Sequence, residues 1–220
     1  MRARWLSHWI HARDRRWPAA LVIVVLIILQ WLTPDRLNFE PPWLLPGLEL
    51  LLLAILVALH RYEVRRKAQL VRTLFTAVFA MASLAMVWSV GRLITLLVIA
   101  GDPDSPKTVI LTGGVIWVNA IGIFGLWYWQ MDGGGPAARA EGRRPYPDFL
   151  FPQTAVQGAA PTGWRPNLID YLYLSFTNST AYSPTHTLPI SALAKLSMAL
   201  QGALSLLIIV VVVARAIGIK

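Results

Sequence analysis

Polar side chains that could coordinate an ion are concentrated in one short segment near the C-terminus. Residues 178–189 contain many hydroxyl groups and two prolines, and they lie between two apolar runs. Hydroxyl and backbone carbonyl oxygens can replace the water around a cation, which is the chemistry of a permeation path. The candidate filter and pore-lining positions are therefore Asn178, Ser179, Thr180, Ala181, Tyr182, Ser183, Pro184 and Thr185.

The residues before this segment predict how it is held. Asn167 suits a helix N-cap, and Asp170 would lie in the first turn, near the positive end of the helix dipole. The helix that follows would have about three turns, which is half the thickness of a membrane. A half-helix, a polar segment and a full apolar run together predict a re-entrant loop, because non-helical backbone at membrane depth must be buried in protein or line water.

The composition of the chain indicates an all-α integral membrane protein. Hydrophobic residues make up 56% of the 220 positions and charged residues only 14%, whereas soluble domains average about half and a quarter. The ten Trp residues fit this interpretation, because aromatic rings collect where lipid meets water. Cysteine is absent, which excludes disulfides, thiolate metal sites and a cysteine nucleophile.

Five apolar runs are long enough to be transmembrane helices, and the re-entrant helix is additional to them. The runs are residues 17–33, 43–60, 71–100, 108–131 and 190–218. We expect no cleaved signal sequence, because no small-x-small site follows the first run.

The chain divides into four regions on this pattern. Residues 1–16 form a basic interfacial N-terminal helix, and residues 17–131 form a four-helix transmembrane region. Residues 132–166 form a polar loop rich in proline and glycine, and residues 167–220 form a pore-like module.

The distribution of basic residues predicts the orientation. Residues 1–16 contain five Arg, residues 60–72 contain five Arg or Lys, and residues 132–166 contain four Arg, whereas the opposite side has only Arg36 and Lys107. By the positive-inside rule the N-terminus and residues 132–166 are cytoplasmic. We expect residues 1–16 to lie on an anionic leaflet, with a solvated basic tail as the alternative.

Two ionisable residues within the predicted spans, Glu49 and Arg92, are candidates for a functional role, because charges are costly there. Glu49 would lie about two turns below the outer surface on the second span, and Arg92 toward the outer end of the third. An ion pair between neighbouring helices is the expected role. A part in permeation or gating, or snorkelling toward the surface, stays open.

The last 50 residues resemble the pore module of the potassium-channel superfamily, in which an aromatic-rich pore helix precedes a filter and an inner helix with a glycine hinge. The matching positions are Tyr173-Leu174-Ser175-Phe176 in the pore helix, Pro189 after the filter, Leu193-Ala194-Lys195 at the turn, and Gly202 with Ser205 at the hinge. The resemblance implies a cyclic homotetramer. In that family the filter loop enters from outside, whereas the arginine distribution here places it in the cytoplasm.

The filter positions differ from that family in the residues that allow tight carbonyl coordination. The opening Thr180 is kept, but both glycines are missing, and Ser183 and Thr185 could adopt left-handed dihedrals only with strain. We therefore expect weak discrimination between potassium and sodium. The whole chain also resembles a group of small bacterial membrane proteins with channel-like sequences, which implies a multi-pass protein of the bacterial inner membrane.

The function that these features favour is a pore-forming, cation-permeable and weakly selective ion channel. A non-conducting membrane scaffold or regulatory subunit is the alternative, followed by an anion channel, which His186 and Lys195 would favour. An enzyme is not expected, because the four His residues are scattered and no nucleophile elbow occurs. We expect no cofactor beyond permeant monovalent ions, and no nucleic-acid partner.

Overall fold

The computed structural model describes five long stretches of the chain: residues 17–31, 68–95, 106–140, 142–180 and 187–217. A few residues between 43 and 54 are also described. The predicted second span therefore falls mostly outside the described residues, and Glu49 with it. The basic segment 1–16 and residues 181–186 also lie outside.

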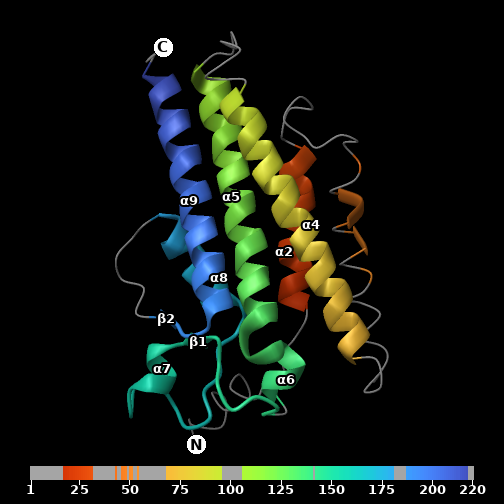
Figure 1. Cartoon of the computed structure of the whole chain (residues 1–220). Helices are drawn as coiled ribbons and strands as arrows, with labels where there is room; N and C mark the ends of the chain where they lie inside the picture. The colour runs from red at the N-terminus through yellow and green to blue at the C-terminus, as the bar shows by residue number, and fades with distance from the viewer. Residues whose placement is uncertain are drawn as a thin grey trace, which may run out of the picture.

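The described part is mostly helical (Figure 1). The long helices are α2 (Trp17–Trp31), α4 (Ala68–Ile94), α5 (Pro106–Met131) and α9 (Ala192–Ala216), and α8 (Leu168–Ser179) is a shorter helix of 12 residues. The short elements are η4 (Asp132–Gly134), α6 (Pro136–Ala140), β1 (Phe149–Leu150), α7 (Pro152–Ala155) and β2 (Leu188–Pro189).

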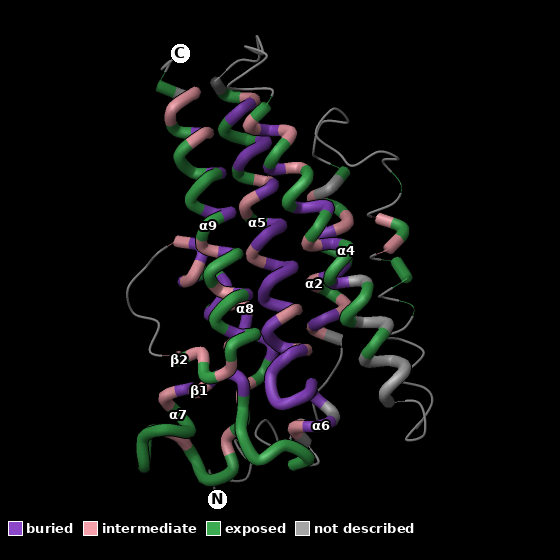
Figure 2. Tube along the Cα trace, in the orientation of Figure 1, coloured by how far each residue is buried: buried purple, intermediate pink, exposed green. Residues whose placement is uncertain are grey.

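Helix α5 is the centre of the bundle, because α2, α4, α8 and α9 all pack against it. Small residues on α5 allow these neighbours to come close. Gly122 faces Leu26 of α2, and Gly113 faces Val212 of α9. Figure 2 shows α5 buried along most of its length, whereas α4 and α9 are exposed along one side.

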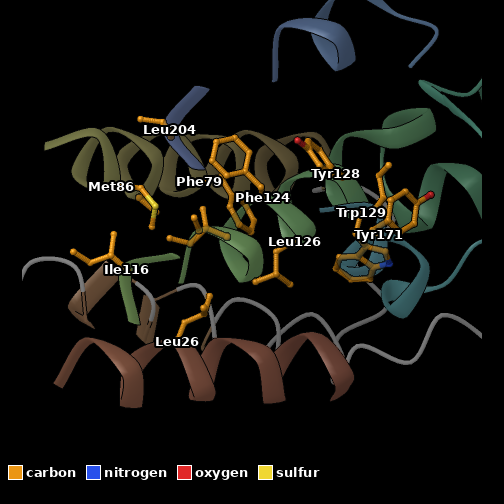
Figure 3. Close-up of a cluster of buried hydrophobic side chains, with 14 of the residues drawn as sticks. Leu26, Phe79, Met86, Ile116, Phe124, Leu126, Tyr128, Trp129, Tyr171 and Leu204 are labelled. Carbon is orange, nitrogen blue, oxygen red and sulfur yellow. The ribbon is translucent and has the colours of Figure 1, made fainter. Parts of the chain in front are cut away.

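The core is apolar and aromatic, and side chains of α2, α4, α8 and α9 join those of α5 in it (Figure 3). Leu26 of α2, Phe79 of α4 and Leu204 of α9 belong to it. Phe79 packs edge-on against Trp127 of α5, with ring centroids 6.0 Å apart. Burial of such side chains stabilises a helix by about 1.5–3 kcal/mol each in water, whereas in lipid close packing makes this contribution.

Two helices in the described part are long and apolar enough to cross a bilayer, Lys107–Gly134 and Ala192–Arg215. They fit a membrane protein. The apolar stretches of the other two long helices, Pro18–Leu29 and Phe79–Ile94, are shorter than the roughly 20 residues that a crossing needs. The predicted runs 17–33 and 71–100 extend beyond the described residues, so the five-span topology stays a prediction.

The surface of α9 also fits a lipid environment. Its outward side carries large apolar residues, such as Leu196 with 68% of its surface exposed and Leu206 with 62%. Its uncharged polar residues Ser197, Gln201 and Ser205 are all buried, and its charged residues Lys195 and Arg215 lie near its two ends. This inverts the pattern of a soluble amphipathic helix, in which the polar side faces outward.

The helix ends that adjoin the basic segments lie at one end of the bundle. In Figure 1 the start of α4 and the end of α5 lie at the lower end, as do the start of α9 and the elements of residues 132–166. The orientation that the arginine distribution indicates stays a prediction.

Candidate functional site

Helix α8 is the short helix that the sequence predicts. The Ile169 N–H donates to Asn167 Oδ1 at 2.8 Å, and the Asn167 N–H donates to Asp170 Oδ2 at 2.7 Å. These bonds make a capping box, so the prediction of the helix start is confirmed. With 12 residues α8 spans about 18 Å, roughly half of a bilayer.

Burial raises the pKa of the Asp170 carboxyl above its ordinary value, and the backbone N–H groups of Asn167 and Asp170 lower it in part. The carboxylate lies at the positive end of the α8 dipole. Asp170 therefore caps the end of α8 that is remote from the candidate filter.

Helix α8 packs against both α5 and α9, which also pack against each other. A Cβ atom added at Gly125 of α5 would lie 3.1 Å from the Cα of Leu172 and 2.7 Å from its Cδ2, so only glycine allows this approach. Further along, Ser175 Oγ donates to the Ile121 carbonyl at 2.8 Å. The position of α8 is therefore set by backbone contact with α5.

A buried amide joins the three helices near the end of α8. Gln201 of α9 accepts hydrogen bonds at Oε1 from the Tyr128 hydroxyl and, at 3.0 Å, from Asn178 Nδ2. Its Nε2 lies 2.6 Å from Ser175 Oγ and 2.7 Å from Ser179 Oγ. Gln201 is fully buried, and both polar atoms of its amide have partners.

A second buried polar cluster lies where α5 ends. Asp132 is 1% exposed, and its Oδ1 accepts from the Asp148 N–H at 2.6 Å and from the Phe149 N–H at 3.1 Å. Its Oδ2 accepts from the Tyr171 hydroxyl of α8. In return, the Gly133 N–H donates to Asp148 Oδ2 at 3.0 Å. One carboxylate thus connects the end of α5, the strand β1 and the first turns of α8.

The turn after α5 depends on the glycines at positions 133 and 135. Gly133 has a φ of +56° and Gly135 of +97°, values that glycine adopts without strain. Arg139 then folds back, and its Nη1 donates at 2.7 Å to the carbonyl oxygens of Trp129 and Asp132. Its guanidinium lies 5.2 Å from the centre of the Tyr171 ring. A cation thus satisfies carbonyls at the negative end of α5.

A two-stranded antiparallel sheet, with two residues in each strand, closes the base of the candidate site. Phe149 of β1 pairs with Pro189 of β2, and the Ile190 N–H donates to the Asp148 carbonyl at 2.8 Å. The segment before α8 and the segment after residue 186 therefore lie at the same end of the bundle. Helix α8 leads away from that end, and the chain has come back to it at β2 (Figure 1).

The charges exposed at this end are positive. The described carboxylates Asp132, Asp148 and Asp170 are buried or half-buried. Four basic side chains, by contrast, are exposed: Arg143, Arg144, Arg165 and Lys195. The surface potential over the described residues of this end therefore favours anions.

The structure describes three of the eight predicted pore-lining residues. Asn178 and Ser179 are bound to Gln201 inside the subunit, and Asn178 Nδ2 also donates to the Met198 carbonyl at 2.9 Å. The Thr180 hydroxyl donates to the Phe176 and Thr177 carbonyls at 3.1 and 3.2 Å. The other five positions, Ala181, Tyr182, Ser183, Pro184 and Thr185, lie outside the described residues.

The structure describes three of the four residues predicted for the hinge and the ion pair. Helix α9 is continuous through Gly202 and Ser205, with Gly202 facing open space and Ser205 fully buried. Arg92 is half-buried in the last turn of α4. Its predicted partner Glu49 lies outside the described residues. The hinge and the ion pair both stay predictions.

Sequence reasoning missed the residues that hold the site together. Gln201 is an amide within an apolar run, and that alone could have marked it as a hydrogen-bonding centre. The sequence pattern places Asp132 only in the polar loop. The aromatic residues Phe149 and Phe151 close to Asp148 could have indicated that this part of the loop is anchored to the bundle, and both are buried.

The last two observations concern metal-binding side chains and similarity to known proteins. Across the ranges that the structure describes, no three His, Asp or Glu side chains gather where they could hold a metal ion. Comparison with protein-family models, curated proteins and solved structures finds no match to this chain.

Proposed function

We propose that the protein forms an ion-conducting pore in which α8 and the residues that follow it make a re-entrant loop. The observation that carries this proposal is the position of α8. It is a half-membrane helix packed against two apolar helices, and the chain before and after it meets in the β1–β2 pair. Backbone that enters a membrane halfway and returns is tolerated where it is buried in protein or lines water.

The pore would be shared by several subunits, because one re-entrant loop cannot surround an axis. We propose a closed homotetramer in the inner membrane of a bacterium, with the N-terminus in the cytoplasm. In it the C-terminal ends of four α8 helices would converge, and their partial negative charges would favour cations. Five transmembrane helices in each subunit would surround this centre.

We propose weak ion selectivity, for two reasons. The missing glycines prevent the stacked carbonyl rings that distinguish potassium from sodium, so hydroxyl groups would leave an ion partly hydrated. The exposed Arg143, Arg144, Arg165 and Lys195 oppose the α8 dipoles, because they raise the local concentration of anions. An anion channel is therefore the competing selectivity.

A non-conducting scaffold or regulatory subunit is the second candidate function. Gln201 forms hydrogen bonds with Asn178 and Ser179, so two of the predicted pore-lining side chains have partners inside the subunit. This observation favours the second function. In this alternative α8 is a packing element, and Thr180 faces no ion.

Two matched substitutions test the proposal. Thr180→Val keeps the side-chain shape and removes a hydroxyl at the end of α8. Thr177→Val makes the same change at a buried position, where the hydroxyl bonds to carbonyls of its own helix at 2.9 and 3.0 Å. In planar bilayers, unitary conductance should fall in Thr180→Val and stay at the wild-type value in Thr177→Val. Equal conductance in all three proteins would remove Thr180 from the pore.

A further inference from the structure

The hydrogen-bond partners of Gln201 differ from those of Ser197, another buried polar residue of α9. Ser197, one turn earlier, accepts a hydrogen bond from Trp127 Nε1 of α5 at 3.1 Å. Gln201 also reaches α5, through the Tyr128 hydroxyl, but most of its bonds go to α8. It is therefore the α9 residue whose side chain connects directly to the polar end of the half-helix.

The α8 partners of Gln201 all lie in the last two turns of that helix. Nε2 contacts Ser175 at its carbonyl oxygen, 3.0 Å away, and at its hydroxyl, and it contacts the Ser179 hydroxyl as well. Oε1 accepts from Asn178. The amide thus fixes the turn from which the chain leaves toward residue 181, and no charge is involved.

The first turns of α8 are fixed by other groups. Tyr171 bonds to Asp132, and Leu172 lies against Gly125. Apart from Gln201, the end of α8 is held by the Phe176 ring, whose centroid lies 6.1 Å from that of Trp117, and by Ser175 Oγ, which donates to the Ile121 carbonyl. Loss of the Gln201 amide would therefore loosen the end of α8 more than its start.

We infer that Gln201 is a positioning residue that holds the C-terminal end of α8 against α9 and thereby sets the geometry of the pore. This inference rests on the proposed function, because it assigns the conductance to the position of the α8 end. Its physical basis is the four hydrogen bonds to Ser175, Asn178 and Ser179 across the α8–α9 contact. A movement of α9 at this level would be transmitted to Thr180, the C-cap of α8.

Amide hydrogen exchange tests the positioning role without any need for conduction. The variants are Gln201→Leu, which removes all the bonds, and Ser179→Ala, which removes one and leaves the packing of α9 unchanged. Ser197→Ala is the matched control, because it removes a hydrogen bond between α9 and α5 that does not touch α8. Exchange is measured in detergent on peptides from α8 and from α5.

We expect amides in the last turn of α8 to exchange about tenfold faster in Ser179→Ala, and faster still in Gln201→Leu, with the α5 peptides unchanged. Ser197→Ala should leave the α8 amides at the wild-type rate. If Gln201→Leu does not fold, the contrast between Ser179→Ala and Ser197→Ala decides the question. Equal α8 exchange in these two variants overturns the inference.

Planar-bilayer recording of the same proteins then links position to conduction. Ser179→Ala should change the unitary conductance about twofold or more, and Ser197→Ala should leave it unchanged. Faster exchange with an unaltered conductance overturns the functional part of the inference. A wild-type protein that conducts nothing would instead contradict the proposed function, while the exchange rates would still show whether Gln201 positions α8.

Discussion

Substitution of Asp132 tests whether one buried carboxylate holds the base of the bundle together. In Asp132→Ala, three buried donors lose their acceptor: the N–H groups of Asp148 and Phe149 and the hydroxyl of Tyr171. Each unpaired buried group costs about 1–3 kcal/mol, and some would rebond to water, so we expect a loss of about 3–6 kcal/mol. That is a large share of the 5–15 kcal/mol typical of a folded domain.

Two milder variants divide this cost between its components. Asp132→Asn keeps an oxygen for the two N–H groups and removes the charge, and we expect a loss of about 1–2 kcal/mol. Tyr171→Phe leaves the carboxylate without its hydroxyl partner, which should cost about 1.5–3 kcal/mol. The double variant Asp132→Asn/Tyr171→Phe should lose less than the sum, because the two groups share one hydrogen bond.

The assay is reversible unfolding in mixed micelles, followed by tryptophan fluorescence from the ten Trp residues. Arg144→Gln is the control, since Arg144 is exposed and a surface change should stay within about 0.5 kcal/mol of wild type. A free energy of unfolding for Asp132→Ala within 1 kcal/mol of wild type would refute the reasoning, because it would mean that the three donors find equally good partners elsewhere.

Three further predictions concern packing, assembly and orientation. Gly125→Ala should destabilise the protein by about 1–3 kcal/mol, because its methyl group would push Leu172 of α8 away, whereas Gly114→Ala, which meets nothing within 4 Å, should be neutral or stabilising in the same unfolding assay. Mass photometry in detergent should give a closed oligomer, most simply a tetramer of 24.5 kDa chains, and monomers alone would speak against a shared pore. Because the chain has no Cys, single cysteines introduced at Ser7 and Lys220 report orientation in intact cells: an impermeant thiol reagent should label position 220 only, and labelling of position 7 from outside would reverse the topology.

Features of the fold that depend on neighbouring residues could be predicted from the sequence. The capping box needs only Asn167 and Asp170, three positions apart, and α8 begins where these residues indicate. The end of α5 follows from the glycines after Met131, since consecutive positive φ angles cannot continue a helix. Both features are local, so the order of residue types along the chain contains them.

Features that depend on the packing of distant segments could not be predicted. Gln201 meets Tyr128 across 73 positions and Ser175 across 26, and Asp132 meets Tyr171 across 39. The residues that neighbour each of them in the sequence do not indicate its hydrogen-bond partner. Asn178 and Ser179 are an example. Their residue types suit a pore lining, but their hydrogen bonds to Gln201 depend on how α8 packs against α9.

Single-channel recording of the purified wild-type protein in a planar lipid bilayer tests the central claim most directly. A re-entrant α8 in a closed oligomer predicts discrete current steps. With potassium on one side and sodium on the other, the reversal potential should lie near zero, because the filter positions lack the glycines for stacked carbonyl rings. An oligomer that is folded and inserted, yet passes no current under any monovalent salt, would contradict the account and favour the scaffold.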